Sequence, residues 1–408
     1  MSLKTKNQHA RALYLKQVRL QGYRTIQDTQ MDFEPGLNII IGKNGVGKSN
    51  FLLYLKTAID FKISLFSHLY ATLLFSMPDQ KEICINIKSN IRSTIMNGSP
   101  TIQANPVTFS VNQASDSEQL FESQKDFFNF LNLEGLLYST IFIAHGLPSS
   151  YPMVNTPFSF KINRTGVLED YAGLKTAGEG SFCLENVFNF ILYKGLEIYG
   201  DTKLPGKKEM ESLITETEKK IKSLESALKK YTDIKGIRFN KTYNVVFDKV
   251  KGEFTVSNLF LDFKVGSQWL PFAHLSDGTR RLFYIVSEVA FPALFYFRDN
   301  QFTAIDGQAG KIILIEEPEL GLHPRQLDGL LLFLQESSLS HQLIITTHAP
   351  QVLDILRRDQ LGKITIARLS SNGTKLRHLT AKEREKATLY MEEEAYLSDY
   401  WRFSDLEQ

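Results

Sequence analysis

The chain has 408 residues, a length that allows two or three domains or one core interrupted by a large insertion. Its 47 Lys and Arg residues against 45 Asp and Glu give a net charge of +2, which argues against a surface that is basic throughout but leaves a local basic patch open. With 43% hydrophobic and 23% charged residues, the composition excludes a largely disordered chain.

The sequence shows no clear feature of export or membrane insertion. The longest apolar stretch, residues 282–297, is interrupted by Ser287, Glu288 and Pro292 and is too short and too polar to span a bilayer. The N-terminus lacks an apolar signal-peptide core, and two cysteines are too few for a disulfide framework. We therefore expect a cytoplasmic protein with no membrane partner.

The first predicted elements surround a glycine-rich segment. Residues 13–20 have the mixed polarity of a strand, and Leu37–Ile41 form a short apolar run typical of a buried parallel strand. Gly42 ends this run, and from Ser49 onward apolar residues recur at helical spacing. The sequence predicts a strand, a loop and a helix in succession.

The middle of the chain is predicted to contain short elements. We expect strands at 81–88 and 106–112, a helical patch at 121–132, loops over 146–181 and a helix near 184–198. These elements carry no recognisable motif.

Residues 207–231 then show apolar side chains at alternating spacings of three and four, the pattern of a heptad repeat. Three heptads of helix span only about 35 Å. The pattern therefore predicts a short helical prong rather than a long coiled-coil arm. Its core positions are Met210, Ile214, Thr217, Ile221, Leu224, Leu228 and Tyr231.

The last third of the chain alternates strands and helices. Strand-like alternation over 253–264 precedes helical spacing over 279–297. Two apolar strands, Lys311–Ile315 and Gln342–Ile345, flank a helix with a leucine stripe near 327–334. A strand–helix–strand unit with apolar strands implies a parallel sheet.

The glycine-rich segment fits the pattern G-x-x-x-x-G-K-[ST] and lies between a buried strand and a helix, as a phosphate-binding P-loop does. Its glycines let backbone N–H groups surround phosphates, and the helix N-terminus favours anions. We expect Lys48 to reach the β- and γ-phosphates and Ser49 to bind Mg²⁺. The predicted nucleotide-binding residues are Gly42, Lys43, Asn44, Gly45, Val46, Gly47, Lys48, Ser49 and the adjacent Asn50.

Three side chains at strand ends are candidates for the chemistry. Glu316 and Glu317 follow a buried strand, and His348 follows the next strand. We expect Glu316 to lie at the Mg²⁺, Glu317 to polarise the attacking water and His348 to sense the γ-phosphate, because ligands collect at the carboxyl ends of strands in open α/β sheets. The alternative interpretation is two solvated carboxylates at a turn and a structural histidine.

A second anion-binding segment is predicted at Ser276-Asp277-Gly278, immediately before a helix. The alternative is a purely structural N-cap, since Ser and Asp cap helices well. Its position after the P-loop and before the double-Glu strand favours the functional interpretation.

Together these segments resemble the ABC-type ATPases of the SMC, RecF and OLD group, AAA-family ATPases of bacterial defence or DNA repair type. The resemblance rests on Gly42–Ser49, Leu275–Arg280, Ile312–Pro324 and His348, which are similar to Walker A, signature, Walker B with D-loop, and switch histidine. It covers about residues 15–60 and 255–370. It implies an α/β P-loop NTPase fold, similar to an SMC head, with a mixed β-sheet core and a large α+β, partly helical insertion.

The resemblance also implies domain limits. The ATPase core would comprise 1–60 and 255–378, the insertion 61–254 and an acidic tail 379–408. The 60 residues after His348 are too few for the Toprim nuclease of OLD proteins, so we expect none. Glu316 departs from the more frequent Asp, and no Q-loop glutamine is assigned, Gln103 and Gln113 being only candidates.

By resemblance, two ATP molecules with Mg²⁺ would be held in a homodimer. Each would lie between the P-loop of one subunit and Ser276-Asp277-Gly278 of the other, with Arg24 touching phosphate or ribose.

The favoured function is an ATPase switch of an anti-phage defence system that controls a separate effector. The acidic tail would be a docking element for that effector or would simply pack on its own core. The alternatives are a RecF-like repair ATPase that binds DNA through the basic segment 203–251, and a transporter ATPase subunit, which fits worse because LSDGTR replaces the usual LSGGQ.

Overall fold

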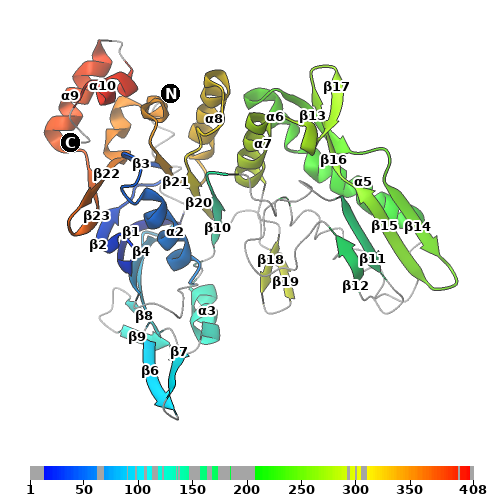
Figure 1. The fold of residues 1–408 in the computed structure, drawn as a ribbon, viewed down its shortest axis with the longest axis horizontal. Coiled ribbons are helices and arrows are strands. Elements are labelled where there is room, and N and C mark those ends of the chain that lie inside the picture. The colour runs from blue at the N-terminus through cyan, green and yellow to red at the C-terminus, as the bar shows by residue number, and fades with distance from the viewer. Residues whose placement is uncertain are drawn as a thin grey trace. The chain divides into compact units, whose positions relative to one another are not determined.

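The structure is a computed structural model whose elements are drawn in Figure 1. It forms two compact units, the first built from Met1–His145, Ala309–Glu319 and Leu334–Gln408, the second from Gly146–Gln308 and Leu320–Phe333. No helix in the described part of the chain is long and apolar enough to cross a membrane. The residues described are 13–61, 69–89, 91–96, 99–104, 108–112, 118–121, 124–134, 136, 138–146, 157–162, 168–172, 184, 207–291, 295–298, 301–304, 310–393 and 396–404.

A six-stranded mixed sheet organises the first unit. Its strands, in spatial order, are β10 (Tyr138–Ile143), β20 (Gly310–Glu316), β21 (Gln342–Thr347), β3 (Leu37–Ile41), β22 (Ile364–Ser370) and β23 (Gly373–His378). The first five run parallel, and β23 returns antiparallel to β22. All residues of β3 and β21 are buried, as the continuous apolar runs predict.

A second sheet of the same unit is antiparallel. Its strands, in spatial order, are β2 (Ile26–Asp32), β1 (Tyr14–Tyr23), β4 (Tyr70–Ser76), β5 (Glu82–Lys88), β8 (Thr108–Asn112) and β9 (Glu118–Phe121). The helix α2 (Lys48–Ile59) packs on strands of both sheets. The core lies where Phe51, Leu52 and Leu55 of α2 meet the apolar faces of the two sheets.

Smaller elements complete the first unit. A separate hairpin pairs β6 (Ile91–Met96) with β7 (Ser99–Ala104), and α3 (Gln124–Leu133) packs beside β9. The predicted strands at 81–88 and 106–112 and the helical patch at 121–132 correspond to β5, β8 and α3.

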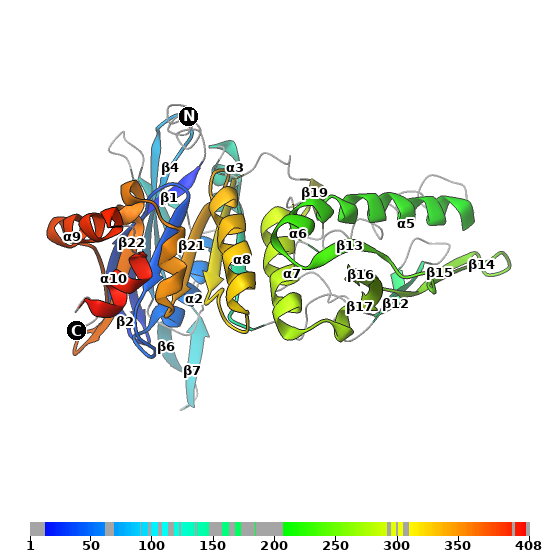
Figure 2. The same cartoon turned by 90° about the horizontal axis from the view of Figure 1, so that it is seen from above.

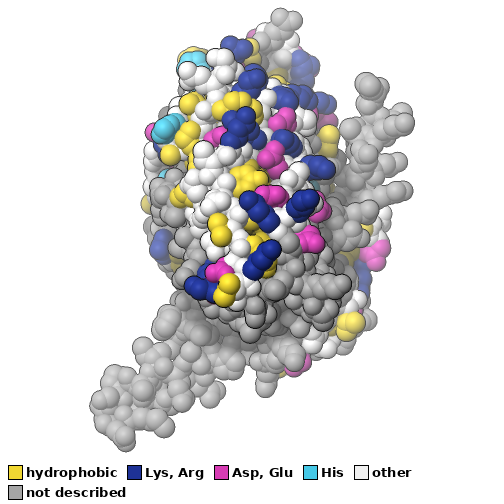
Figure 3. All heavy atoms as spheres, turned by 90° about the vertical axis from the view of Figure 1, so that its right-hand side faces the viewer, with side chains coloured by type: hydrophobic (Ala, Val, Ile, Leu, Met, Phe, Trp, Pro, Cys, Tyr) yellow, Lys and Arg dark blue, Asp and Glu magenta, His cyan; other side chains and the backbone are white. Residues whose placement is uncertain are grey.

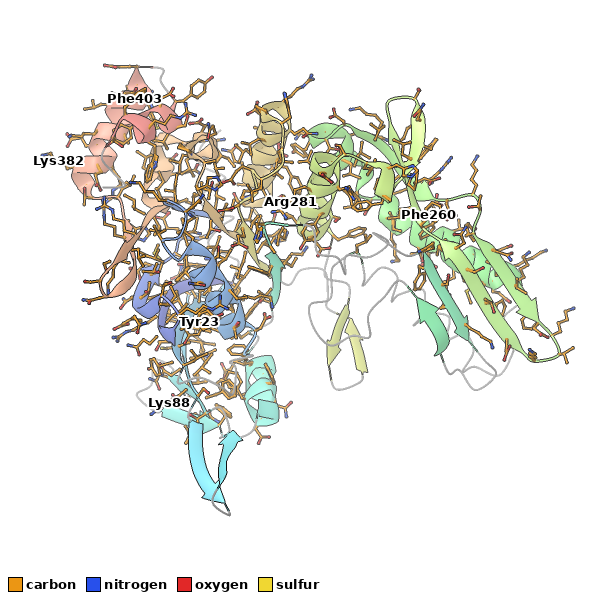
Figure 4. All side chains as sticks on the ribbon, viewed as in Figure 1. Tyr23, Lys88, Phe260, Arg281, Lys382 and Phe403 are labelled. Carbon is orange, nitrogen blue, oxygen red and sulfur yellow. The ribbon has the colours of Figure 1, made fainter. Side chains whose placement is uncertain are left out.

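The acidic C-terminal segment forms two helices, α9 (Ala381–Glu392) and α10 (Leu397–Phe403), after the 3-10 segments η2 (Pro350–Ile355) and η3 (Arg358–Lys363). Helix α10 packs on η2, where Trp401 is buried and Asp354 accepts a hydrogen bond of 2.8 Å from the backbone N–H of Ser398. The structure therefore shows the packing of the second alternative, and the docking element stays a prediction. Phe403 remains exposed (Figure 4).

The described part of the second unit contains two small antiparallel sheets, a separate hairpin and several helices. The first sheet is β12 (Leu168–Ala172), β11 (Phe158–Ile162), β15 (Glu253–Leu259) and β14 (Asn244–Asp248). The second is β13 (Ile234–Phe239), β16 (Leu261–Val265) and β17 (Gln268–Pro271), and the hairpin β18 (Phe295–Arg298) with β19 (Gln301–Ala304) stands apart. The helices are α5 (Lys207–Lys222), α6 (Glu225–Tyr231), α7 (Asp277–Ala290) and α8 (Pro324–Ser337). A 3-10 turn, η1 (Phe272–His274), precedes α7 in the chain.

The segment 207–231, predicted as a short helical prong, is helical. It divides into α5 and α6 at Ser223-Leu224, and both helices pack on β13 (Figure 2). All seven heptad positions are buried, so the apolar stripe serves a helix-on-sheet contact instead of a coiled coil.

Three other expectations differ from the structure. The predicted loops at 146–181 include strands β11 and β12, the strand at 253–264 divides between two sheets, and the helix at 279–297 ends at Ala290. Of the expected helix at 184–198, only Leu184 belongs to the described residues. The boundaries of the two compact units differ from those predicted for the ATPase core, the insertion and the tail. The predicted domain limits therefore stay predictions.

Candidate functional site

The glycine-rich loop follows β3 and leads directly into α2, the arrangement predicted for a P-loop. Gly45 and Gly47 have φ values of 80° and 97°, which other residues adopt only with strain. Gly47 caps α2 without a side-chain hydrogen bond, and the first turn contains no acidic residue. The first N–H groups of a helix have no acceptor within the helix, and this end favours an anion.

Lys48 lies beneath this loop and is buried. Its Nζ donates to the carbonyl oxygens of Gly42 at 2.6 Å and Lys43 at 2.9 Å. The ammonium group is thus held at the concave side of the loop, where phosphate oxygens would replace carbonyl oxygens as acceptors.

Two hydroxyl groups support the loop, that of Thr25 from the turn between β1 and β2 and that of Thr374 from β23. Thr374 Oγ1 lies 2.9 Å from both the Val46 carbonyl oxygen and Thr25 Oγ1. A Cβ at Gly47 would lie 2.0 Å from Thr374 Oγ1, so a side chain at this position has no room. The sequence analysis missed Thr25 and Thr374, which lie 349 residues apart and share no motif.

Arg24 is held beside the start of α2. It has a left-handed backbone with φ 49°, its Nη1 donates to Asn50 Oδ1 at 3.1 Å, and its guanidinium lies 5.0 Å from the ring centre of Tyr23. Tyr23, labelled in Figure 4, lies against Tyr54 of α2 with ring centres 5.2 Å apart. The structure therefore brings Arg24 and Asn50 together near the loop.

Glu316 ends β20, and its side chain is only 8% exposed. Burial raises the pKa of this carboxyl group, but hydrogen bonds from the Ser49 hydroxyl and from His145 lower it more, so the pKa lies below its usual value. The carboxylate is thus kept ionised beside Ser49, at the place predicted for Mg²⁺.

His145 was not predicted as part of this site. It follows β10, and its Nδ1 lies 3.1 Å from Glu316 Oε2, to which its backbone N–H also donates at 3.4 Å. The sequence carries one signal for it, a histidine two residues after the apolar-aromatic run of Tyr138–Ile143.

Glu317 and His348 face each other across the ends of β20 and β21. His348 Nδ1 lies 3.2 Å from Glu317 Oε1. Glu317 has φ 44°, and its N–H donates to the Thr346 carbonyl at 2.8 Å. The left-handed backbone turns the chain after β20, so that Glu316 and Glu317 point to different neighbours.

Glu319 orients His348 through hydrogen bonds to Thr347 and to the backbone of His348. Its Oε1 accepts from the Thr347 hydroxyl at 2.6 Å and from the His348 N–H at 3.3 Å, and its side chain is 8% exposed. Glu319 belongs to the motif that follows the double-Glu pair, but its sequence position alone predicts no role for it.

Of the two glutamines considered for a Q-loop, only Gln103 belongs to the described residues, and it does not lie at this edge of the sheet. Gln103 belongs to β7, in a hairpin separate from the parallel strands, and Gln113 lies outside the described residues.

The segment Ser276-Asp277-Gly278 belongs to the second unit and begins α7. Ser276 Oγ accepts from the Thr279 N–H at 3.2 Å, and Asp277 pairs with Arg280. A Cβ at Gly278 would lie 2.8 Å from Gln326 Oε1 and 2.9 Å from the Gly321 carbonyl oxygen. The N-cap of the structural interpretation is therefore present, while Ser276 and Asp277 stay exposed.

Two protein-family models match the chain. The model described as an AAA ATPase domain matches residues 13–143, and one described as an AAA domain, putative AbiEii toxin, Type IV TA system, matches residues 198–354. They cover both sequence regions from which the motifs come.

Curated relatives match over a short segment. An SMC protein 3 homolog of Plasmodium falciparum is 51% identical over 53 residues, 13% of this chain and 4% of that protein. The RecF replication and repair protein of Streptococcus agalactiae is 48% identical over 40 residues, 10% of this chain and 11% of RecF. The chain thus spans about a tenth or less of either relative's length.

Both matched models describe AAA domains, and the chain is similar to the SMC/RecF-like ABC-type ATPases.

Solved SMC heads also match, at low similarity. An SMC head bound to the C-terminal winged-helix domain of ScpA has a TM-score of 0.49, and the SMC head of Thermotoga maritima one of 0.43; each is 13% identical and covers 90% of this chain and 99% of its own. With TM-scores below 0.5 they add nothing to the assignment. The predicted fold class, a P-loop ATPase with a mixed sheet, agrees with the AAA family match and the sheet order.

The residues at this sheet edge fit a magnesium ion that is shared with a nucleotide. Ser49 and Glu316 offer a hydroxyl and an ionised carboxylate in mutual contact, the oxygen donors that Mg²⁺ prefers. Among the described residues, no group of three or more His, Cys, Asp or Glu is spaced to hold a metal alone. Mg²⁺ usually binds through one or two protein ligands plus substrate phosphates, and this pair suits that mode.

We predict that Glu319→Ala lowers the turnover number for ATP hydrolysis with little change in the KM for ATP. The substitution removes two hydrogen bonds that hold Thr347 and His348, each worth about 1 kcal/mol, so a fall of about tenfold or more is expected. Steady-state ATPase kinetics measure both constants. Glu319→Gln keeps an oxygen acceptor and serves as the matched control; equal losses in the two variants would contradict the orienting role.

Proposed function

We propose that the chain binds ATP with Mg²⁺ and hydrolyses it. The observation that supports this best is the convergence of Lys48, Ser49, Glu316, Glu317 and His348 at one edge of the parallel sheet. Five side chains with complementary roles in phosphoryl transfer come from three elements, and a single structural purpose does not explain the set.

In this proposal the P-loop N–H groups and Lys48 hold the phosphates, while Ser49 and Glu316 hold the ion. The bound Mg²⁺ would neutralise charge on the β- and γ-phosphates. Glu317 would accept a proton from the attacking water and align it, and His348, 3.2 Å from Glu317, would contact the γ-phosphate. Arg24 would lie against phosphate or ribose, supported by its hydrogen bond to Asn50.

The proposal includes a homodimer that holds ATP between subunits. The N-terminus of α7 carries the exposed Ser276 and Asp277, which would face the γ-phosphate bound by the P-loop of the partner copy. ATP would then favour the dimer and hydrolysis would release it, a two-state switch biased by the γ-phosphate.

For the biological role we propose the ATPase component of a cytoplasmic anti-phage defence system that controls a separate effector. The support is the family description over residues 198–354, which names a putative AbiEii toxin of a type IV toxin–antitoxin system. The exposed Phe403 and Tyr396 at α10 offer apolar side chains for a docking contact with that effector.

A RecF-like repair ATPase that binds DNA is the second candidate. Its support is the RecF match and the Lys-rich second unit, although Figure 3 shows acidic side chains among the basic ones. Several of these lysines pair with glutamates along α5 and α6, as Lys222 does with Glu218 and Lys229 with Glu225. Such pairing leaves less free positive charge for phosphates.

The hydrolysis proposal predicts different losses at two positions. Lys48→Ala should weaken ATP binding, because the β- and γ-phosphates lose their cation, whereas Glu317→Gln should bind ATP normally and turn it over at least about 100-fold more slowly, the low end of general-base contributions. Calorimetric ATP titration and phosphate release measure the two effects. Full turnover by Glu317→Gln would remove Glu317 from the role of base.

The dimer proposal predicts that charge at Ser276 decides association. In the Glu317→Gln background, ATP should convert the wild-type Ser276 chain to a dimer, and Ser276→Asp should prevent it by placing a carboxylate at the γ-phosphate. Ser276→Asn is the matched control, because Asn and Asp cap α7 equally well. Light scattering after size exclusion gives the masses, and an unchanged ATP-dependent dimer with Ser276→Asp would refute the proposed contact.

DNA binding separates the two candidate roles. If the chain is a RecF-like factor, the ATP-bound Glu317→Gln protein should bind duplex DNA with an affinity that falls steeply as salt rises. Fluorescence anisotropy with a labelled duplex at two salt concentrations tests this, with Lys48→Ala as the control that lacks bound ATP. Absence of ATP-dependent binding would favour the effector-controlling switch.

A further inference from the structure

His145 lies where a strand end adjoins the predicted ion site. Strand β10 pairs in parallel register with β20, from Tyr138 opposite Gly310 to Ile143 opposite Ile315 (Figure 1). Two residues past β10, His145 therefore lies beside Glu316. Its side chain is 65% exposed, whereas that of Glu316 is 8% exposed, so the imidazole lies on the open side of a buried carboxylate.

The contact between the two side chains is close and involves one oxygen. His145 Nδ1 lies 3.1 Å from Glu316 Oε2, and the same oxygen accepts the backbone N–H of His145 at 3.4 Å. The other neighbour of this carboxylate is the Ser49 hydroxyl. Ser49, Glu316 and His145 come from α2, β20 and the end of β10, and together they present two oxygens and one nitrogen.

The spacing of Nδ1 and Oε2 suits two ligands of one ion. Metal–nitrogen and metal–oxygen bonds are about 2.1 Å long, so adjacent ligands at a right angle in an octahedral site lie about 3 Å apart. The observed 3.1 Å matches this separation, and the exposed imidazole would turn from the carboxylate toward the ion to bind it.

Resting on the proposed ATPase function, we propose that Nδ1 of His145 is a direct ligand of the nucleotide-bound divalent cation, together with Glu316 and Ser49. An imidazole ligand changes which metal the site prefers. Oxygen-only sites suit Mg²⁺, whereas nitrogen ligands raise affinity for first-row transition ions. The site should therefore bind the Mn²⁺ complex of the nucleotide more tightly than the Mg²⁺ complex.

Electron spin echo spectroscopy of bound Mn²⁺ tests this directly. The probe is Mn²⁺ with the β,γ-methylene analogue of ATP, whose phosphate bridge contains no nitrogen, on the full chain. We expect modulation from a coordinated ¹⁴N in the wild type and its loss in His145→Gln. His348→Gln is the matched control, because His348 lies beside Glu317 at the same sheet edge and should leave the modulation unchanged.

A second readout is metal selectivity. The ratio of nucleotide affinities with Mn²⁺ and Mg²⁺, measured by calorimetry, should fall about tenfold or more in His145→Gln, the scale found when groups that support a metal site are removed. Mn²⁺ bound without ¹⁴N modulation, or modulation that persists in His145→Gln, would overturn the ligand assignment and leave the ATPase proposal standing. If the wild type binds neither metal–nucleotide complex, both proposals fail.

Discussion

The parallel pairing of β20, β21 and β3 is the constraint on which the rest of the first unit depends. The register sets Glu316 opposite Thr346 and Thr347 opposite Ile41, so the carboxyl ends of the three strands lie level with one another. Continuous burial fixes that register, because a slip of one residue would move polar ends into the apolar layer. The P-loop, the glutamate pair and His348 are neighbours for this reason.

Burying carboxylates at one edge of the sheet costs free energy, which local hydrogen bonds offset. Glu316 and Glu319 are both more than nine-tenths buried, and each accepts hydrogen bonds, from Ser49 and His145 in one case and from Thr347 and His348 in the other. Glu317 adds backbone strain of about 1–2 kcal/mol through its left-handed conformation. Strain and buried charge held at one edge are typical of a site kept ready for a charged ligand.

Parts of this arrangement follow from the sequence and parts do not. The P-loop and the strands ending at Glu316 and Thr347 are encoded locally, in a glycine pattern and in unbroken apolar runs. The roles of His145, Thr374 and Glu319 depend on strand order and on contacts across long stretches of chain, for which no local pattern exists. The heptad over 207–231 misled for a related reason: an apolar stripe fixes a helix face, but either a helix or a sheet can cover it.

The central claim, that this sheet edge binds the triphosphate of ATP, is tested most directly by a crystal structure of the Glu317→Gln protein with ATP and Mg²⁺. The account predicts that Lys48 Nζ exchanges the carbonyl oxygens of Gly42 and Lys43 for phosphate oxygens, with the ion at Ser49 and Glu316 and the γ-phosphate near His348. ATP bound away from the Gly42–Ser49 loop, or an ion that contacts neither Ser49 nor Glu316, would contradict it.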